Sequence, residues 1–115
     1  MILSHDGNVD DIVCVCMCLG DPKVELIGVC ITEADCYLSD AYEATKKVLR
    51  YAGREDIPVA CCASAGVNPF PPQFREYSAF PNMLPALNED GGKYTPPPPG
   101  PEASSAPRPF TRCPC

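Results

Sequence analysis

The fold is decided by residues 1–31, MILSHDGNVDDIVCVCMCLGDPKVELIGVCI. A short apolar strand is predicted over 1–4 and a helix over about 10–19, which the turn-forming residues 20–22 end. Residues 25–31 form a near-continuous apolar run, which is typical of a strand buried on both faces. Strand, helix and strand in this order predict a β-α-β unit built on a parallel sheet.

The same alternation continues to about residue 62. A second helix is predicted over 39–52, because its apolar residues recur at helical spacing and Gly53 is a natural residue to follow the last turn. Residues 57–61 are a short third strand. The expected fold class is therefore α/β, a Rossmann-like parallel sheet present as a β-α-β-α-β portion. Beyond Ser64 we expect an ordered loop region, since closely spaced prolines leave little room for regular elements.

The C-terminal residues differ in composition from the rest of the chain. Eight of the 25 residues in 91–115 are proline, and few are large and apolar. We therefore divide the chain into a partial domain over 1–90 and a disordered Pro-rich tail over 91–115. A spacer is the favoured role for this tail over a ligand of SH3 or WW domains.

Deleting residues 91–115 is expected to leave the melting temperature unchanged. Their composition cannot bury enough apolar surface to offset an ordering entropy of about 1–2 kcal/mol per residue. Scanning calorimetry of the chain with and without the tail measures this, and limited proteolysis should remove the tail first. A lower melting temperature after truncation at Asp90 would contradict the prediction.

Charge and cysteine content limit the partners and the compartment. The formal net charge of -6 disfavours nucleic acid and anionic membranes as partners. The apolar run 12–19 is too short to span a bilayer, and no basic segment precedes it, so we expect no export signal. We predict a cytoplasmic protein with reduced thiols, neither a disulfide framework nor a zinc site. The cysteines expected to be small buried hydrophobes are Cys14, Cys16, Cys18, Cys30, Cys61 and Cys62.

Three carboxylates, Asp6, Asp10 and Asp11, fall within six residues at the end of the first predicted strand and the start of the first helix. Ligands of open parallel sheets bind at the carboxyl ends of strands. Asp10 and Asp11 also fit an ordinary first helical turn, where backbone N–H groups favour negative charge. Three anions in one short loop nevertheless cost electrostatic energy unless a cation is present, and calcium or magnesium would supply it. The spacing alone leaves both interpretations open.

The segment ILSHDGNVDD, residues 2–11, resembles the D-x-D-x-G-x-D-D signature that opens the inosine-uridine preferring nucleoside hydrolases. The likeness continues through ELIGV at 25–29, YAGR at 51–54 and DIPV at 56–59, and it extends over roughly residues 1–90. It implies the nucleoside hydrolase fold, calcium as cofactor and a ribonucleoside as substrate. The implied reaction is hydrolysis of the N-glycosidic bond, in purine and pyrimidine salvage.

The resemblance also implies roles for individual residues. Asp6 matches the aspartate that ligates calcium and activates the attacking water, and Asp11 matches the bidentate calcium ligand. Asp10 matches the carboxylate that accepts hydrogen bonds from the ribose hydroxyls. Asp35 falls where many members have an asparagine beside the ribose.

Two positions depart from the signature. Ser4 replaces its first aspartate, which removes an acid that would support the loop. Asn8 replaces its glycine, and because asparagine tolerates positive φ better than most residues, we expect the turn to form at Asn8.

The resemblance further implies that the remaining metal ligands, ribose contacts and leaving-group acid lie outside these 115 residues. We therefore expect a truncated chain that does not turn over substrate by itself. The alternative is a non-enzymatic fragment that binds a divalent ion weakly or pairs with another subunit through an open sheet edge. Pairing through such an edge would be compatible with a homo-oligomer. A phosphatase of the haloacid dehalogenase type ranks last, because it needs an acid where Ser4 stands.

Overall fold

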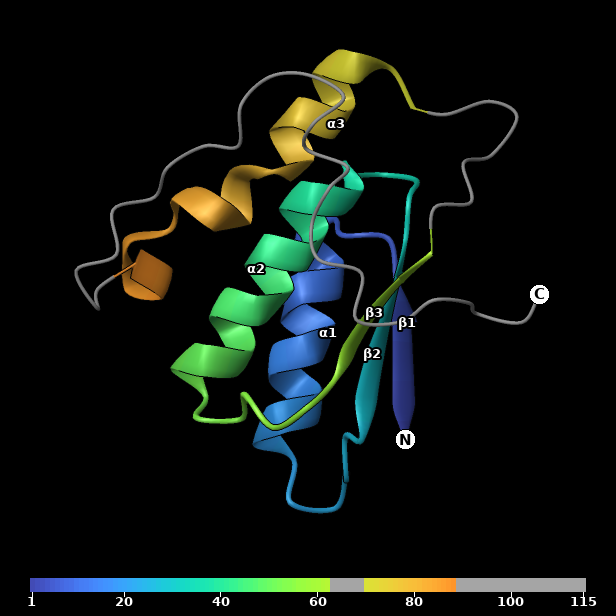
Figure 1. Ribbon diagram of the computed structural model, residues 1–115. Coiled ribbons are helices and arrows are strands. Elements are labelled where there is room, and N and C mark those ends of the chain that lie inside the picture. Colours follow the sequence, from blue (N-terminus) through green and yellow to red (C-terminus); the bar gives the residue numbers. More distant parts are fainter. Residues whose placement is uncertain (63–69, 89–115) are drawn as a thin grey trace.

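The computed structural model of the protein describes residues 1–62 and 70–88. Within them the strands β1 (Ile2–His5), β2 (Gly28–Thr32) and β3 (Val59–Cys62) form a parallel sheet in the order β1-β2-β3 (Figure 1). This arrangement confirms the predicted α/β class and the parallel sheet. The first strand lies close to its predicted range, whereas the second begins later, at Gly28.

Two helices connect the three strands. Helix α1 (Val9–Gly20) joins β1 to β2, and α2 (Leu38–Tyr51) joins β2 to β3. Both helices lie on the same face of the sheet (Figure 1). Right-handed crossovers explain this, since each strand is added on the same side of the preceding one. The carboxyl ends of the strands therefore meet at one edge, together with the loops that lead into the helices.

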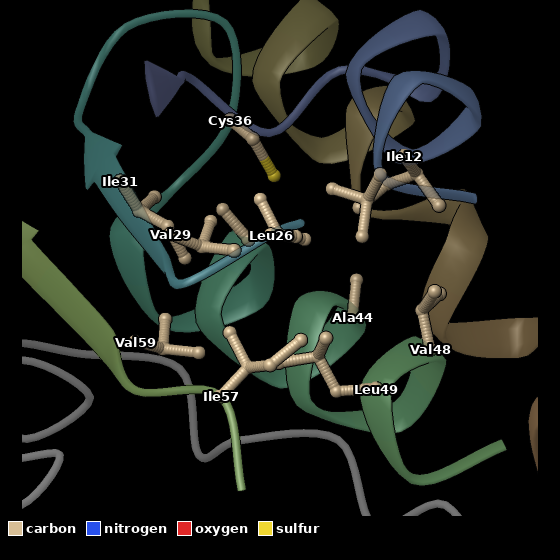
Figure 2. Packing of buried hydrophobic residues seen from close by; sticks show 12 residues of the cluster. Ile12, Leu26, Val29, Ile31, Cys36, Ala44, Val48, Leu49, Ile57 and Val59 are labelled. Atoms are coloured by element: carbon tan, nitrogen blue, oxygen red, sulfur yellow. The ribbon is translucent and has the colours of Figure 1, made fainter. Parts of the chain in front are cut away.

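The core lies between the sheet and the two helices (Figure 2). Alternate strand residues point toward the helices, as the pleat of a strand requires, and apolar residues at helical spacing meet them from α1 and α2. The buried cluster consists of Ile12, Val15, Leu26, Val29, Ile31, Cys36, Ala41, Ala44, Val48, Leu49, Ile57 and Val59. This core fixes the positions of the strand ends that carry the polar loops.

The cysteines of α1 correct one expectation. None of the six cysteines predicted to be buried is fully buried. Cys14 and Cys16 are exposed and the other four are half-buried, whereas Cys36, which was not among the predicted ones, is buried. The buried face of α1 is formed by Ile12 and Val15, and the two exposed thiols lie on other faces of the helix. An apolar run therefore does not by itself decide burial when a helix has only one covered face. Free thiols in the described part of the chain include Cys14, Cys16, Cys18, Cys36 and Cys61.

A second correction concerns the region after Ser64, where we expected loops only. It contains helix α3 (Pro72–Ser78) and the 3-10 helices η1 (Phe80–Met83) and η2 (Pro85–Asn88). The prolines lie in the first turn of each element, where the missing backbone N–H is not needed and the fixed φ is already helical. The prediction was wrong because it treated each proline as a residue that prevents a helix, whereas a proline is also favoured in the first turn of a helix.

Two further expectations concern membrane contact and the tail. No helix within 1–62 and 70–88 is long and apolar enough to cross a bilayer. The predicted boundary at residue 90 and the Pro-rich tail at 91–115 lie outside the described residues.

Candidate functional site

The loop between β1 and α1 is organised by one carboxylate oxygen. Oδ2 of Asp11 accepts the backbone N–H groups of Asp6 at 3.1 Å, Gly7 at 3.1 Å and Asn8 at 3.3 Å. Successive N–H groups that converge ahead of a helix form a concave binding site for an anion, and here a residue of the helix itself fills it. Asp11 is therefore held in one orientation by the loop that it organises.

Asn8 is the N-cap of α1, which corrects the expectation that it would take a positive φ. Its φ is -72°, and its Oδ1 accepts the N–H of Val9 at 2.7 Å. Asn8 and Asp11 form a reciprocal capping box, which satisfies backbone N–H groups at the N-terminus of the helix. The positive φ of 93° falls on Gly7 instead. The residue with a positive φ in this turn is thus one position earlier than we expected.

The loop between β2 and α2 packs against this first loop. Asn8 donates a hydrogen bond from Nδ2 to Oδ2 of Asp35 at 3.1 Å, and the N–H of Cys36 donates to the carbonyl oxygen of Asp6 at 3.2 Å. Both loops leave the carboxyl ends of neighbouring strands (Figure 1). The fold therefore brings Asp35 beside the loop that carries Asp6 and Asp11.

The three carboxylates concentrate negative charge. Burial, together with the neighbouring carboxylates of Asp11 and Asp35, raises the pKa of Asp6 to about 6. For Asp11, burial also favours the neutral form, but hydrogen bonds from the side chain and backbone of Asp6 outweigh it and lower the pKa. Above pH 6 both carboxylates are ionised and adjacent. Such a pair favours the binding of a cation.

His5, at the end of β1, anchors the strand to α2. It is buried, and its Nε2 lies 3.2 Å from Oγ1 of Thr45. Because that hydroxyl donates to the carbonyl of Ala41 at 2.7 Å, its oxygen is left to accept a hydrogen bond from the Nε2–H group of His5. Burial lowers the pKa of His5, although the charge of Asp11 opposes the shift. A neutral, buried imidazole is suited to positioning β1 rather than to protonating a ligand.

Asp10 is the one predicted site residue that stays apart. Its side chain is exposed in the first turn of α1, and it forms no hydrogen bond with Asp6, Asp11 or Asp35 in the described parts of the chain. Neighbouring residues of a helix point about 100° apart, so Asp11 faces the loop while Asp10 faces solvent.

The carboxylates fit only part of a metal site. Among residues 1–62 and 70–88, no three His, Cys, Asp or Glu side chains are grouped so as to hold a metal ion. Asp6 and Asp11 supply at most two carboxylates, whereas calcium takes about six to eight oxygen ligands. Their chemistry nonetheless suits a hard cation, because the raised pKa of Asp6 reflects negative charge gathered in a partly buried place. The remaining oxygens have to come from other groups.

Sequence reasoning missed two residues around this site. Gly7 carries the positive φ of the loop, and the Asp-Gly-Asn turn was a signal that could have identified it. Arg75, on α3, contacts the loop that holds Asp35 through Glu33 and Cys36. No sequence signal pointed to Arg75, since its helix was not expected and its partners are about 40 residues away.

Comparisons with known proteins agree with these observations. Residues 1–105 match the family model described as inosine-uridine preferring nucleoside hydrolase. The structure is similar to that of an inosine-uridine preferring nucleoside hydrolase from Bacillus anthracis, with a TM-score of 0.73 and 41% sequence identity. This similarity covers 82% of the present chain but only 31% of the other one. No curated protein matches the sequence.

Proposed function

Because the chain belongs to the inosine-uridine preferring nucleoside hydrolase family, we propose that its β1–α1 loop forms one side of a calcium-dependent site that hydrolyses the N-glycosidic bond of ribonucleosides. The observation that carries this proposal is the convergence of Asp6, Asp11 and Asp35 at the carboxyl edge of the sheet. Ligands of open α/β sheets bind at this edge. The other side of the site would come from groups outside residues 1–62 and 70–88.

Asp6 and Asp11 are the residues that would hold the calcium ion. When bound, such an ion acts as a Lewis acid and lowers the pKa of a water molecule. The three N–H groups that hold Asp11 fix its carboxylate before any ligand arrives, so little ordering entropy is lost on binding.

The other steps fall to the carboxylates themselves. Asp6 would accept the proton of the attacking water as a general base. Asp10 and Asp35 would accept hydrogen bonds from the ribose hydroxyls. Breaking an N-glycosidic bond develops positive charge on the ribose ring, and nearby carboxylates stabilise that charge. We assign the protonation of the departing base to no described residue, since His5 is buried and neutral.

The substitution Asp11→Asn is expected to separate cation binding from folding. Asparagine keeps an oxygen that can accept the N–H groups of the loop but loses the charge that attracts a cation. Affinity for calcium should fall roughly tenfold or more, a loss of about 1.4 kcal/mol, with little change in melting temperature. Asp11→Ala should lower both, because it leaves three N–H groups without their acceptor. The calcium affinity is measured by the fall in terbium luminescence as calcium displaces bound terbium. The melting temperature is measured by thermal unfolding in a chelator.

A matched control is Asp21→Asn, at the far end of α1, where Asp21 also accepts a backbone N–H, that of Lys23 at 2.9 Å. It should leave cation affinity unchanged. The unaltered chain should bind calcium more weakly than micromolar, because Asp6 and Asp11 supply only part of the coordination shell. A micromolar or tighter dissociation constant would contradict the incomplete site. Equal affinities in the unaltered chain and both Asp11 variants would place the cation elsewhere.

A second candidate is a non-enzymatic chain that binds a divalent ion weakly or pairs with another subunit. It is favoured by the incomplete group of metal-binding side chains in the described residues. Strands β1 and β3 also both lie at an edge of the described sheet, and the unpaired backbone groups of an edge strand can pair with another chain. The turnover experiment in the Discussion separates this candidate from the first. A cytoplasmic location and a role in nucleoside salvage stay predictions.

A further inference from the structure

Arg75 connects α3 to the loop between β2 and α2. Its Nη2 donates to Oε1 of Glu33 at 2.5 Å and to the carbonyl oxygen of Cys36 at 3.3 Å. Its guanidinium lies over the ring of Tyr37, with Cζ 4.2 Å from the ring centroid. One side chain therefore contacts three residues of a short loop, and these contacts flank Asp35 on both sides. In Figure 1, α3 lies above the carboxyl ends of the strands, close to the start of α2.

The contact is more than a surface ion pair. The side chain of Arg75 is 11% exposed and that of Glu33 is 28% exposed. Exposed ion pairs contribute little to stability, but a planar guanidinium that stacks on an aromatic ring and donates to two acceptors is held in one geometry. Nε of Arg75 is buried without a hydrogen-bond partner among the described residues. This unsatisfied donor costs free energy, which the contacts of the guanidinium with Glu33, Cys36 and Tyr37 have to offset.

The same loop contacts the candidate site on its other side. The peptide groups of Cys36 join the two sides, since its N–H donates to the carbonyl of Asp6 while its carbonyl accepts from Arg75. Asp35 accepts the side-chain N–H of Asn8. The loop therefore lies between Arg75 and the β1–α1 loop.

Holding Asp35 there opposes electrostatic repulsion. Asp35 is hydrogen-bonded to Asn8 and lies near the carboxylate of Asp6, and like charges at short range favour separation. A loop free to move would relieve this repulsion by swinging outward. The bonds from Arg75 to Glu33 and Cys36 act against that movement.

We propose that Arg75 is a positioning residue that holds the β2–α2 loop closed, so that Asp35 stays beside Asp6 on the side of the site assigned to the ribose. The role of Asp35 toward ribose rests on the proposed function. The position of the loop does not, and it can be measured without substrate or metal.

The test compares Arg75→Gln with the control Arg54→Gln in the full chain. Arg54 also pairs with a carboxylate, that of Asp56, but both side chains of that pair are largely exposed. In a chelator, amide hydrogen exchange at Cys36 should accelerate at least roughly tenfold in Arg75→Gln, because local opening becomes easier. Exchange at Val29, whose N–H bonds to the carbonyl of Pro58 inside the sheet, should not change. Arg54→Gln should alter neither amide.

Two outcomes would overturn the proposal. Unchanged exchange at Cys36 in Arg75→Gln would show that the loop stays closed without the arginine. Equal acceleration at Cys36 and Val29 would show that Arg75 supports only the global fold. If Arg75→Gln does not fold, Glu33→Gln removes the ionic partner without touching α3 and should give a smaller acceleration confined to Cys36.

A conservative variant and a cation titration complete the test. Arg75→Lys keeps the charge but loses the planar, forked donor, so it should restore part of the protection at Cys36. Full restoration would reduce the role of Arg75 to its charge and would overturn the positioning geometry. Loss of Asp35 from the cluster should also weaken terbium binding several-fold in Arg75→Gln. If no variant binds a cation, the proposed function fails, whereas a local change at Cys36 still supports the positioning role.

Discussion

Gly7→Ala is expected to destabilise the protein by about 2–5 kcal/mol, because backbone strain and steric overlap add at one position. Gly7 has a φ of +93°, which side chains rarely adopt. A Cβ atom there would lie 2.3 Å from Cβ of Ala41 and 2.9 Å from Cβ of Cys36. Neither neighbour can move easily, since both are buried in the core. The loop would have to shift away from α2, and the N–H groups bound by Asp11 would shift with it.

Gly53→Ala is the matched control. Gly53 also has a positive φ, +68°, but an added Cβ would meet nothing within 4 Å. It should cost only the strain of a left-handed residue, about 1–2 kcal/mol. The free energy of unfolding in urea measures both variants, and Gly7→Ala combined with Ala41→Gly should recover part of the loss. An equal decrease in the free energy of unfolding in the two single variants would show that the close approach of Gly7 to α2 does not affect stability.

The second large effect concerns turnover. We expect no detectable hydrolysis of inosine or uridine by the 115-residue chain, and activity when a C-terminal portion of a family member is joined after Asn88. Asp6→Ala in the joined chain should then reduce turnover by roughly 10²–10⁴-fold or more, because it removes the proposed general base and a metal ligand together. The release of free base from nucleoside, followed by its change in ultraviolet absorbance, measures the rate.

The control for that experiment is Asp21→Ala in the joined chain, which removes a carboxylate distant from the loop and should leave turnover unchanged. Turnover by the unmodified 115 residues would contradict the expectation that the site is incomplete. A joined chain that folds and binds calcium but stays inactive would favour the non-enzymatic candidate. Activity that survives Asp6→Ala would move the general base to another residue.

Local sequence was sufficient for the order of the first five elements and for the loop that carries the first carboxylates. Apolar residues with strand and helix spacing, punctuated by glycine and proline, predicted β1, α1, β2, α2 and β3 in the right order. The capping box of Asn8 and Asp11 was not predicted, although it joins residues only three positions apart. Such features depend on propensities and hydrogen bonds within one or two turns of chain, so they can be inferred without knowledge of the fold.

Other features depend on residues that only folding brings together. The contact of Asp35 with Asn8 spans 27 positions and that of Arg75 with Glu33 spans 42, and no periodicity in the sequence connects either pair. The close approach of Gly7 to Ala41 likewise depends on how α2 packs against the first loop.

The sequence alone therefore determined the α/β order of elements and, through the motif in residues 2–11, the loop and family to which the carboxylates belong. The tertiary structure decided which carboxylates meet and which cysteines are buried. The physical reason is that burial and electrostatic coupling depend on distances through space, which packing sets.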